Sequence, residues 1–365
     1  MRVLTVNPGS SSVKLAIVAD GVELSSVGVD TATAEQTRGP LTELAMRWQP
    51  VDAVGVRFVH GGDRSSATLL DTEETARLAG LVDLAPLHQP LSLELAALAT
   101  ATVAAPVVAC FDTAFHAHMP EPATRYALPK AWAAKYGLRR YGFHGLSCAH
   151  ALRRSSELLH READAMCLVC CHIGSGVSVT AIRDGHSVDT SMGFTPLEGA
   201  AMSTRSGSVD PGLLIYLLRT EATDVKGLEQ ALEHGSGLAG LTGTNGDMRD
   251  VLAARTAGDS DAELAVQVYL HRLRREIGAV AISLDRVDAL VLTGGVAEHQ
   301  PDLIAELVEG LELLGVTVDP DRVRGTGDRL VSPVAAPVDV LVVTAQEGLE
   351  IARQTTNYLA MNGAT

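Results

Sequence analysis

The amino-acid sequence predicts an α/β protein built from two similar domains with a cleft between them. Three observations support this prediction. One order of strands and turns occurs twice, the two copies start about 165 residues apart, and 365 residues with 46% hydrophobic content provide material for two cores. Because the spacing is close to an ordinary domain length, duplication of one domain explains it better than a single-domain fold.

The repeated unit is an apolar strand, a turn rich in glycine and serine, a second strand, an Asp-Gly hairpin and a third strand. Its first copy occupies residues 3–27, with the turn NPGSSS and the hairpin Asp20-Gly21. Its second copy starts at residue 166 and contains the turn HIGSG and the hairpin Asp184-Gly185. Asp-Gly between strand-like runs is a strong hairpin signal. Each copy therefore predicts a three-stranded meander, and the glycines of HIGSG suit close approach of backbone N–H groups to an anion.

Between these motifs, apolar spacing predicts the remaining elements. Helical spacing occurs at residues 73–83, 214–220, 228–234 and about 261–283. A loop bounded by prolines is expected at residues 84–90, and His88 within it is expected to be structural. The chain closes with a strand near residue 340, a turn that holds Glu347 and a final helix.

Charge and composition argue against several kinds of partner. The formal net charge is −15, from 29 basic and 44 acidic residues spread along the chain, so nucleic acid and anionic membranes are not expected partners. No apolar run reaches the ~18 residues of a membrane span and no signal peptide is evident, so a cytoplasmic location is expected. The five cysteines include Cys167-x-x-Cys170 within a predicted strand. They are expected to be reduced core residues, and the scattered histidines indicate no transition-metal site.

Two charged candidates are associated with predicted buried strands. Arg57 falls inside the apolar run of residues 51–62, where an unpaired guanidinium would be costly, so it requires a structural salt bridge or a ligand. Asp112 follows the apolar run that starts at Val107. Catalytic groups in open α/β sheets usually lie at the carboxyl ends of strands, which makes Asp112 a catalytic candidate.

Other candidates lie in loops that contain glycine. His144 stands in YGFHGLS, and Arg205 stands in STRSGS, where a guanidinium suits phosphate or carboxylate oxygens. A solvated surface side chain is the alternative for each. The strand, Gly-Gly turn and helix at residues 287–300 would place backbone N–H groups beside a nucleotide. The G-x-G-x-x-G match at residues 235–240 follows a predicted helix rather than a strand, so it lacks the context of a dinucleotide site.

Six separate motifs resemble those of the acetate kinase family, in the family's order and over nearly the whole chain. They are Asn7–Lys14, Arg57–Gly62, Phe111–His116, Gly142–Gly145, Ser187–Gly199 with Thr204–Gly207, and Thr293–Val296. The resemblance implies two duplicated actin-like (ribonuclease H-like) domains. It places the first at residues 1–113 plus 349–365 and the second, which binds nucleotide, at residues 114–348.

The resemblance also implies roles for individual residues. Asp112 matches the catalytic acidic residue, His144 and Arg205 match the pair that stabilises the transition state, and Arg57 matches the site of the acceptor carboxylate and the phosphoryl group. Asn7 and Glu347 match positions associated with Mg²⁺, for which Mn²⁺ is a possible substitute. The acceptor's methyl group is assigned a pocket of Val59, Leu87, Phe143 and Pro196. Nucleotide contacts are assigned to Lys14, His172, Ile173, Gly174, Ser175, Gly176, Asp247, Met248, Arg249, Gly295, Val296, Ala297, Glu298 and His299.

The activity implied is that of an acetate kinase, which transfers a phosphoryl group reversibly between ATP and acetate to give acetyl phosphate and ADP. The sequence departs from the family's usual residues at Ser175, Met248, Ser208, Ala297, His299 and Gly348, mostly on the nucleotide side. Alternatives are a kinase for propionate or another short-chain carboxylate, a donor other than ATP, and a non-catalytic nucleotide-binding protein of the same fold. The family's habit suggests a homodimer.

Overall fold

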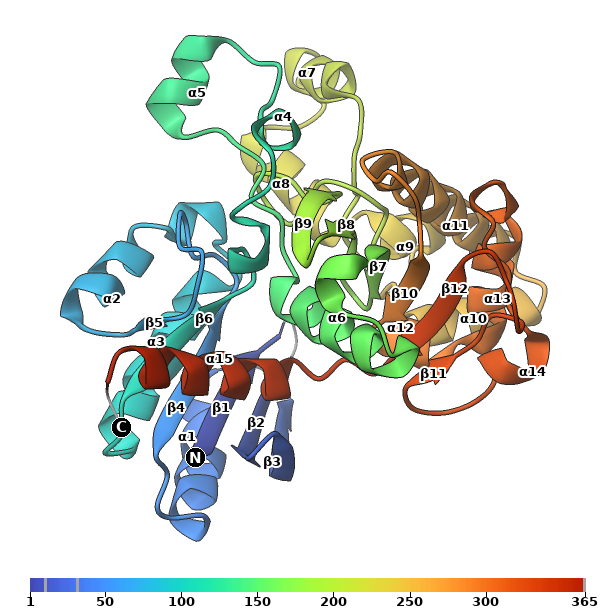
Figure 1. The fold of residues 1–365 in the computed structure, drawn as a ribbon. Coiled ribbons are helices and arrows are strands. Elements are labelled where there is room, and N and C mark those ends of the chain that lie inside the picture. The colour runs from blue at the N-terminus through green and yellow to red at the C-terminus, as the bar shows by residue number, and fades with distance from the viewer. Residues whose placement is uncertain (10–11, 31–32, 364–365) are drawn as a thin grey trace. The chain divides into compact units, whose positions relative to one another are not determined.

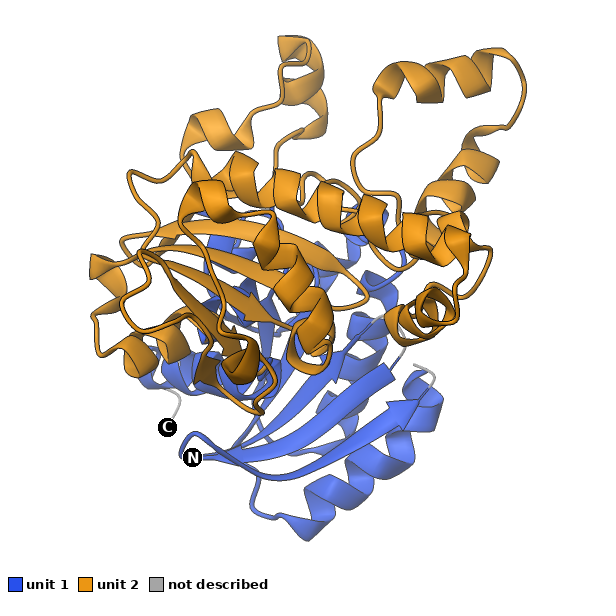
Figure 2. Ribbon diagram, turned by 90° about the vertical axis from the view of Figure 1, so that its right-hand side faces the viewer, with its two compact units in different colours: residues 1–118, 141–150, 345–365 blue, residues 119–140, 151–344 orange. Residues whose placement is uncertain are grey.

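The computed structural model describes residues 1–9, 12–30 and 33–363, and this chain divides into two compact units (Figure 2). Unit 1 comprises residues 1–118, 141–150 and 345–365, and unit 2 comprises residues 119–140 and 151–344. Each unit contains a six-stranded sheet with helices, so the predicted α/β class with two sheets is confirmed. Ser10 and Ser11 of the first Gly/Ser turn lie outside the described residues. The domain limits inferred from the sequence remain a prediction.

The sheet of unit 1 combines a meander with parallel strands (Figure 1). Its strands are β1 (Arg2–Pro8), β2 (Ser12–Ala19), β3 (Val22–Asp30), β4 (Ala53–Phe58), β5 (Thr68–Leu69) and β6 (Val107–Phe111), in the order β3-β2-β1-β4-β6-β5. β1, β2 and β3 are antiparallel, whereas β1, β4 and β6 run parallel. Asp20 and Gly21 close the predicted hairpin at φ 51° and 80°.

Helices cover both faces of this sheet. They are α1 (Ala34–Arg47), α2 (Thr72–Ala79), α3 (Gln89–Thr102) and α15 (Glu347–Met361), with short 3-10 turns at Val82–Leu84 and Ala114–His116. Val54 and Val56 of β4 pack in one core with residues of α1 and α3, whereas Ala53 packs in a second core with Ile351 of α15. Because successive strand residues face opposite ways, Arg57 lies on the α15 face.

The sheet of unit 2 repeats this connectivity. Its strands are β7 (Cys167–Ile173), β8 (Val177–Arg183), β9 (His186–Thr190), β10 (Ala289–Thr293), β11 (Arg329–Leu330) and β12 (Asp339–Val343), in the order β11-β12-β10-β7-β8-β9. β7, β8 and β9 form the antiparallel meander, and β7, β10 and β12 run parallel. Asp184 and Gly185 close its hairpin at φ 54° and 78°. The predicted repetition of strand, turn, strand, hairpin and strand is therefore confirmed.

The helices of unit 2 include α11 (Ser260–Ala281), which is the long amphipathic helix predicted at about residues 261–283. They are α4 (Glu121–Thr124), α5 (Lys130–Tyr136), α7 (Pro211–Arg219), α8 (Val225–His234), α9 (Gly237–Thr242), α10 (Met248–Thr256), α11 (Ser260–Ala281), α12 (Gly295–His299), α13 (Pro301–Glu309) and α14 (Pro320–Val323). Two further 3-10 turns span Ala163–Ala165 and Glu312–Leu314, and α6 (Gly145–Leu159) begins in unit 1 and continues into unit 2.

Two local expectations can be compared directly with the structure. The loop predicted at residues 84–90 is too long, because α3 already begins at Gln89. Pro90 does not prevent this, since the first turn of a helix tolerates a residue without an N–H group. The G-x-G-x-x-G match begins directly after α8 and continues into α9, which confirms that it has no strand before it.

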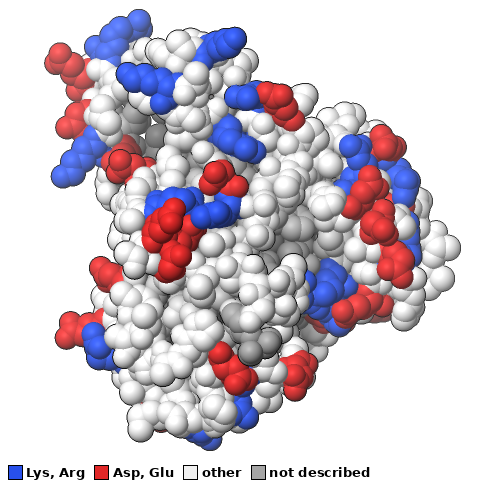
Figure 3. All heavy atoms as spheres, turned by 60° about the vertical axis from the view of Figure 1, so that its left-hand side comes forward, with Lys and Arg blue, Asp and Glu red and all other residues white. Residues whose placement is uncertain are grey.

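Charged side chains and cysteines are distributed as expected. Figure 3 shows acidic and basic side chains interspersed over one face of the molecule. All five cysteines are buried and unbridged, as predicted. Within residues 1–9, 12–30 and 33–363, no group of three or more His, Cys, Asp or Glu could hold a metal ion. No helix in the same part of the chain is long and apolar enough to span a membrane.

The contact of α15 with β4 depends on a glycine, which yields a stability prediction. A Cβ at Gly55 would collide with Thr355 and Ile351 of α15. We expect Gly55→Ala to lower the free energy of unfolding by about 1–3 kcal/mol in urea titrations, because the added carbon overpacks this core. Gly28→Ala in β3, where a Cβ meets no atom within 4 Å, is the matched control and should have an effect within about 0.5 kcal/mol. Equal effects of the two substitutions would contradict the close contact.

Candidate active site

A buried arginine in unit 1 organises several of the predicted site residues. Arg57 lies in β4, where all six residues are buried. Its Nη2 donates to Oδ2 of Asp112 at 2.6 Å, and its Nε lies 3.2 Å from both oxygens of that carboxylate. The side chains of Arg57 and Asp112 are 10% and 1% exposed. Each charge therefore has the partner that its burial requires.

Strand pairing positions this ion pair. β4 and β6 are parallel neighbours, and Arg57 is in register with Cys110. Asp112 is two residues beyond Cys110, so its side chain is on the same face of the sheet. Its N–H donates to the carbonyl of Phe58 at 3.0 Å, which continues the pairing beyond the end of β6. The expected location of Asp112 at a strand's carboxyl end is confirmed.

Asn7 and Glu347 complete a polar cluster around the guanidinium. Nη1 of Arg57 donates to Oδ1 of Asn7 at 3.1 Å and to Oε2 of Glu347 at 3.2 Å. Nδ2 of Asn7 also donates to Oε2 of Glu347 at 2.9 Å. Asn7 lies near the carboxyl end of β1, and Glu347 is the first residue of α15. The fold thus brings together three predicted residues from the first third of the chain and one from near its end.

Burial changes the proton affinities within this cluster. Desolvation raises the pKa of the Asp112 carboxyl to about 6, with repulsion by Glu347 adding to the rise and attraction to Arg57 opposing it. Burial lowers the pKa of Arg57, but attraction to Asp112 and Glu347 outweighs burial, so its pKa is raised. Arg57 therefore stays cationic beside a carboxyl group whose pKa is shifted toward neutrality. Such shifts are typical of functional sites, although structural ion pairs produce them too.

His144 occupies a strained turn next to Asp112. Its φ is 57°, a conformation that costs a residue with a side chain roughly 1–3 kcal/mol. The following residue, Gly145, donates its N–H to the carbonyl of Asp112 at 2.9 Å. A Cβ at Gly145 would collide with this carbonyl oxygen, so the close approach requires glycine. The turn with the predicted imidazole is thus bonded to the backbone of the predicted acid.

Two buried histidines support this turn and were not among the predicted site residues. His116 donates Nε2–H to the carbonyl of Phe143 at 2.9 Å. The ring of His60 meets the rings of Tyr141 and Phe143 edge-on, with centroids 4.5 and 5.8 Å apart. Burial lowers the pKa of both imidazoles to about 4, and the charge of Arg77 adds to the effect at His60. Both histidines are therefore neutral at physiological pH. The signal that could have identified them is their position next to strands predicted to be buried.

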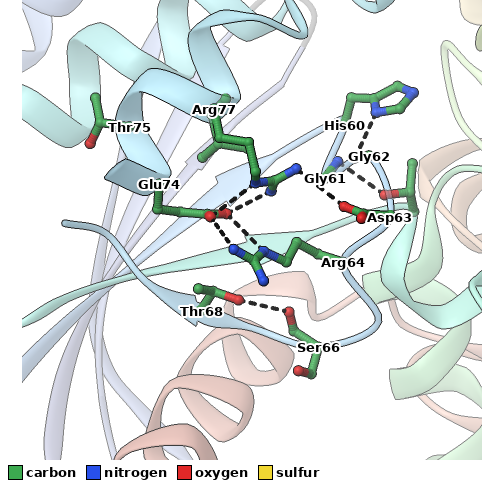
Figure 4. A network of polar contacts seen from close by, with 12 residues as sticks. His60, Gly61, Gly62, Asp63, Arg64, Ser66, Thr68, Glu74, Thr75 and Arg77 are labelled. Atoms are coloured by element: carbon green, nitrogen blue, oxygen red, sulfur yellow. Dashed lines mark hydrogen bonds and ion pairs between the residues drawn. The ribbon is translucent and has the colours of Figure 1, made fainter. Parts of the chain in front are cut away.

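A second buried carboxylate stabilises the turn after β4 (Figure 4). Glu74 of α2 is 3% exposed and accepts hydrogen bonds from Arg64 and Arg77, with the shortest at 2.6 Å for each. Arg77 also pairs with Asp63 at 3.5 Å, and the N–H of Gly62 donates to Nδ1 of His60 at 3.0 Å. This network holds the segment that follows Arg57. Sequence inspection missed it because its members are separated by a loop and a strand.

The other predicted residues of unit 1 are less closely associated with the cluster. Val59 and Phe143, two of the residues assigned to the acceptor's methyl pocket, are buried, whereas Leu87 is 51% exposed. Lys14 is in register with Asn7, but its ammonium forms a salt bridge with Glu23 at 3.1 Å. A phosphate contact from Lys14 would therefore compete with Glu23.

In unit 2, two glycine-containing turns lie at the ends of neighbouring parallel strands. His172 at the end of β7 is in register with Thr293 at the end of β10. Gly174 donates its N–H to the carbonyl of Gly176 at 3.0 Å, which closes the HIGSG turn. Gly294 adopts φ 93°, and a Cβ there would lie 2.8 Å from the carbonyl oxygen of Ile173. The two segments assigned to the nucleotide, the turn at residues 172–176 and α12 at residues 295–299, are thus adjacent.

The remaining nucleotide candidates lie at the start of α10. Asp247 caps this helix, since its Oδ1 accepts the N–H of Arg249 at 2.8 Å, and the two side chains form an exposed ion pair. Met248 is buried, 4% exposed, as is Ala297 of α12 at 1%. The structure therefore presents Arg249 to solvent and packs Met248 inside unit 2.

Arg205 is the predicted cation of unit 2. Its Nη1 donates to the carbonyl of Pro196 at 2.5 Å. Burial lowers the pKa of Arg205, and attraction to Glu233 opposes this effect. Within the described ranges, no carboxylate lies within salt-bridge distance of its guanidinium, in contrast to Arg57. A partly buried arginine with this environment is suited to bind an anion.

Comparisons with known proteins connect both units to one family. The model of the acetokinase family matches residues 41–353. An acetate kinase of Synechococcus sp. (strain JA-2-3B'a(2-13)) is 46% identical over 312 residues, which cover 85% of this chain and 77% of that protein. The crystal structure of Porphyromonas gingivalis acetate kinase has a TM-score of 0.89 at 32% identity, and that of a propionate kinase from Francisella tularensis subsp. tularensis SCHU S4 has a TM-score of 0.90 at 30% identity. Each alignment covers 98% of this chain and 99% of the solved chain, so the predicted fold is confirmed.

The Glu74 network predicts a pH dependence of stability. Two arginines outweigh burial and lower the pKa of Glu74 from 4.5 to about 2. A lowered carboxyl pKa contributes stability that is fully present above pH 4.5 and is lost as the pH falls toward 2. We expect Glu74→Gln to lower the free energy of unfolding by about 3 kcal/mol at pH 7 and by less at pH 3, measured by urea titration. The exposed Glu73→Gln is the control, and a Glu74→Gln effect independent of pH would contradict the ionic role.

Proposed function

The chain belongs to the acetokinase family, and we propose that it catalyses reversible phosphoryl transfer between ATP and acetate, giving acetyl phosphate and ADP. The observation that carries this proposal is the buried cluster in which Arg57 contacts Asp112, Asn7 and Glu347. Phosphoryl transfer requires positioning and charge stabilisation more than covalent chemistry by the protein. A fixed guanidinium beside oxygen ligands supplies the positioning, and the charge of Arg205, which bonds a neutral carbonyl, contributes the charge stabilisation.

In the proposed reaction, an oxygen of acetate attacks the γ-phosphorus of ATP as the bond to the β–γ bridging oxygen breaks and its electron pair leaves with ADP. Acetate is a carboxylate with a pKa near that of Glu, about 4, so it is already ionised at neutral pH and needs no general base. We assign Arg57, Arg205 and His144 to the charge that develops on the phosphoryl oxygens. Asp112 is assigned the role of the catalytic acidic residue. It also holds the guanidinium of Arg57 in place.

We assign Mg²⁺ to Asn7 and Glu347. An amide oxygen and a carboxylate are the hard ligands that Mg²⁺ prefers, and Mn²⁺ accepts the same ligand type. Mg²⁺ commonly keeps waters and substrate phosphates as its remaining ligands, which agrees with the small number of acidic groups here. When bound, the ion would neutralise charge on the β- and γ-phosphates of the nucleotide.

We assign ATP and ADP to the turn at residues 172–176 and to α12 at residues 295–299, with residues 247–249 on the adenosine side and Lys14 at the phosphates. The methyl group of acetate is assigned to Val59, Leu87, Phe143 and Pro196. These roles rest on the family motifs, and the adjacency of the 172–176 turn and α12 in unit 2 supports the first assignment. Such a reaction fits a cytoplasmic enzyme, because ATP is available there.

A propionate kinase is the second candidate, because the Francisella tularensis propionate kinase shares the whole fold at 30% identity. Acetate and propionate differ by one methylene, for which an apolar pocket discriminates by about 10- to 200-fold. The residues assigned to the pocket do not separate the two substrates by themselves.

The proposed activity can be tested directly with hydroxylamine trapping. We expect purified protein with ATP, Mg²⁺ and acetate to form acetyl phosphate, with kcat/KM for acetate at least about 10-fold above that for butyrate. A higher value for propionate than for acetate would select the second candidate. Activity with pyrophosphate but not ATP would reassign the donor, and no product with any short-chain acid would leave a non-catalytic nucleotide-binding protein.

We also propose a homodimer, which an apolar helix in unit 2 supports. α7 has no buried residue, and its Leu213, Ile215 and Tyr216 are 48%, 61% and 53% exposed. Large apolar side chains clustered on one exposed helix are typical of an interaction surface. A second copy of this chain is the occupant we assign to this helix.

Light scattering after gel filtration tests this assignment. We expect the wild-type chain to be dimeric and Ile215→Asp to weaken association at least about 10-fold, because it places a charge in a dry interface. Leu313→Asp, at a 98% exposed position outside α7, is the matched control and should leave the dimer intact. A monomeric wild type, or an unaffected Ile215→Asp dimer, would contradict the proposal.

A further inference from the structure

The structure assigns a positioning role to three polar residues of unit 2, Tyr126, Arg140 and Glu198, which we call the Tyr126 clamp. We infer that the clamp fixes the loop at residues 191–199 and, through the carbonyl of Pro196, the guanidinium of Arg205. The catalytic consequence rests on the proposed function, in which Arg205 acts on the phosphoryl group. The clamp itself follows from contacts within unit 2.

Tyr126 joins the loop at two points. Its hydroxyl donates to Oε2 of Glu198 at 2.6 Å and accepts the backbone N–H of Phe194 at 2.8 Å. Burial, and the hydrogen bond to Glu198, raise the pKa of this hydroxyl, so it stays protonated and its donor direction is fixed. One side chain therefore bonds both the start and the end of the segment between Phe194 and Glu198.

Arg140 contacts both Glu198 and the start of the same loop. Its Nη2 donates to Oε1 of Glu198 at 2.8 Å, and its Nη1 donates to the carbonyl of Ser191 at 3.1 Å. The guanidinium carbon lies 5.5 Å from the centroid of the Tyr126 ring, which is within cation–π range. The Arg140 and Glu198 side chains are 17% and 35% exposed. Both oxygens of Glu198 are thus engaged, each by a different member of the clamp.

Glycine at position 193 shows how closely the loop packs on the clamp. A Cβ there would collide with the carboxylate of Glu198 and the hydroxyl of Tyr126. This observation is independent of the hydrogen bonds and indicates that the loop backbone lies directly against the clamp.

Arg205 receives its support from the same loop. Its Nη1 donates to the carbonyl of Pro196, which lies in the chain between Phe194 and Glu198, the two residues that Tyr126 bonds. The backbone carbonyl of Arg205 accepts the N–H of Met202 at 3.1 Å, so the main chain is fixed separately from the side chain. Movement of Pro196 would therefore displace the guanidinium without unfolding the STRSGS segment. Misplacement of a catalytic group by about 1 Å can cost on the order of 100-fold in rate.

Amide hydrogen exchange tests the clamp independently of the substrate. We expect Tyr126→Phe to accelerate exchange in residues 191–199 about 10-fold or more, because it removes the acceptor of the Phe194 N–H and the donor to Glu198. Tyr269→Phe is the control, since Tyr269 lies in unit 2, is buried, and has a hydroxyl with no hydrogen-bond partner among the described atoms. Unchanged exchange in Tyr126→Phe would overturn the clamp, whatever the reaction proves to be.

A double-mutant cycle tests its effect on Arg205. With ATP and acetate, we expect Tyr126→Phe to lower kcat about 10-fold while the KM for ATP changes less than about twofold, and Tyr269→Phe to retain normal turnover. In an Arg205→Lys background, Tyr126→Phe should cost less than about threefold, because the guanidinium that the clamp positions is already absent. An undiminished 10-fold loss in that background would show that the clamp does not act through Arg205. If the wild type forms no acyl phosphate, the proposed function fails, and hydrogen exchange alone then decides the clamp.

Discussion

The burial of Arg57 inside β4 is the constraint on which the candidate site depends. A guanidinium in a fully buried strand must have an anionic partner, and Asp112 supplies it at the end of the neighbouring strand. Nη1 of Arg57 then donates to Asn7 of the parallel strand β1 and to Glu347 of α15. Removing one partner of such a pair leaves a buried charge uncompensated, at a cost of about 3–5 kcal/mol. The same contacts that stabilise unit 1 therefore hold the groups assigned to chemistry.

Much of this arrangement follows from patterns that are local in the sequence. Alternation along β4 separates Val54 and Val56, which pack in the α1 and α3 core, from Arg57 on the opposite face. Parallel strands end at the same edge of a sheet, which explains why Asn7 and Asp112 both reach Arg57 there. The Asp-Gly hairpins and the repeated meander are equally local, since turn type depends on a few residues. These features could be predicted from the sequence for that reason.

The supporting contacts could not be predicted, because they join side chains whose separation in sequence carries no periodic signal. The hydrogen bond from His116 to Phe143 and the hold of Glu74 on Arg64 and Arg77 arise only after the loops are packed. The positive φ of His144 is imposed by its neighbours rather than by its own preference, since a histidine rarely adopts this conformation unaided. For such residues, the only signal in the sequence is a polar side chain among apolar neighbours, which indicates burial but not the partner.

The two site arginines differ in how their charge is balanced, and this difference suggests separate tasks. Arg57 is neutralised by Asp112 and Glu347, and its Nε, Nη1 and Nη2 all donate within the cluster, so an anion near it gains little net attraction. Arg205 bonds a neutral carbonyl, so its charge is not compensated by any salt bridge in the described chain. Burial without such a partner lowers the pKa of Arg205. An anion bound at Arg205 would restore that balance. In a chain with a net charge of −15, attraction for phosphate requires such a local cation, and Arg205 meets this requirement better than Arg57 does.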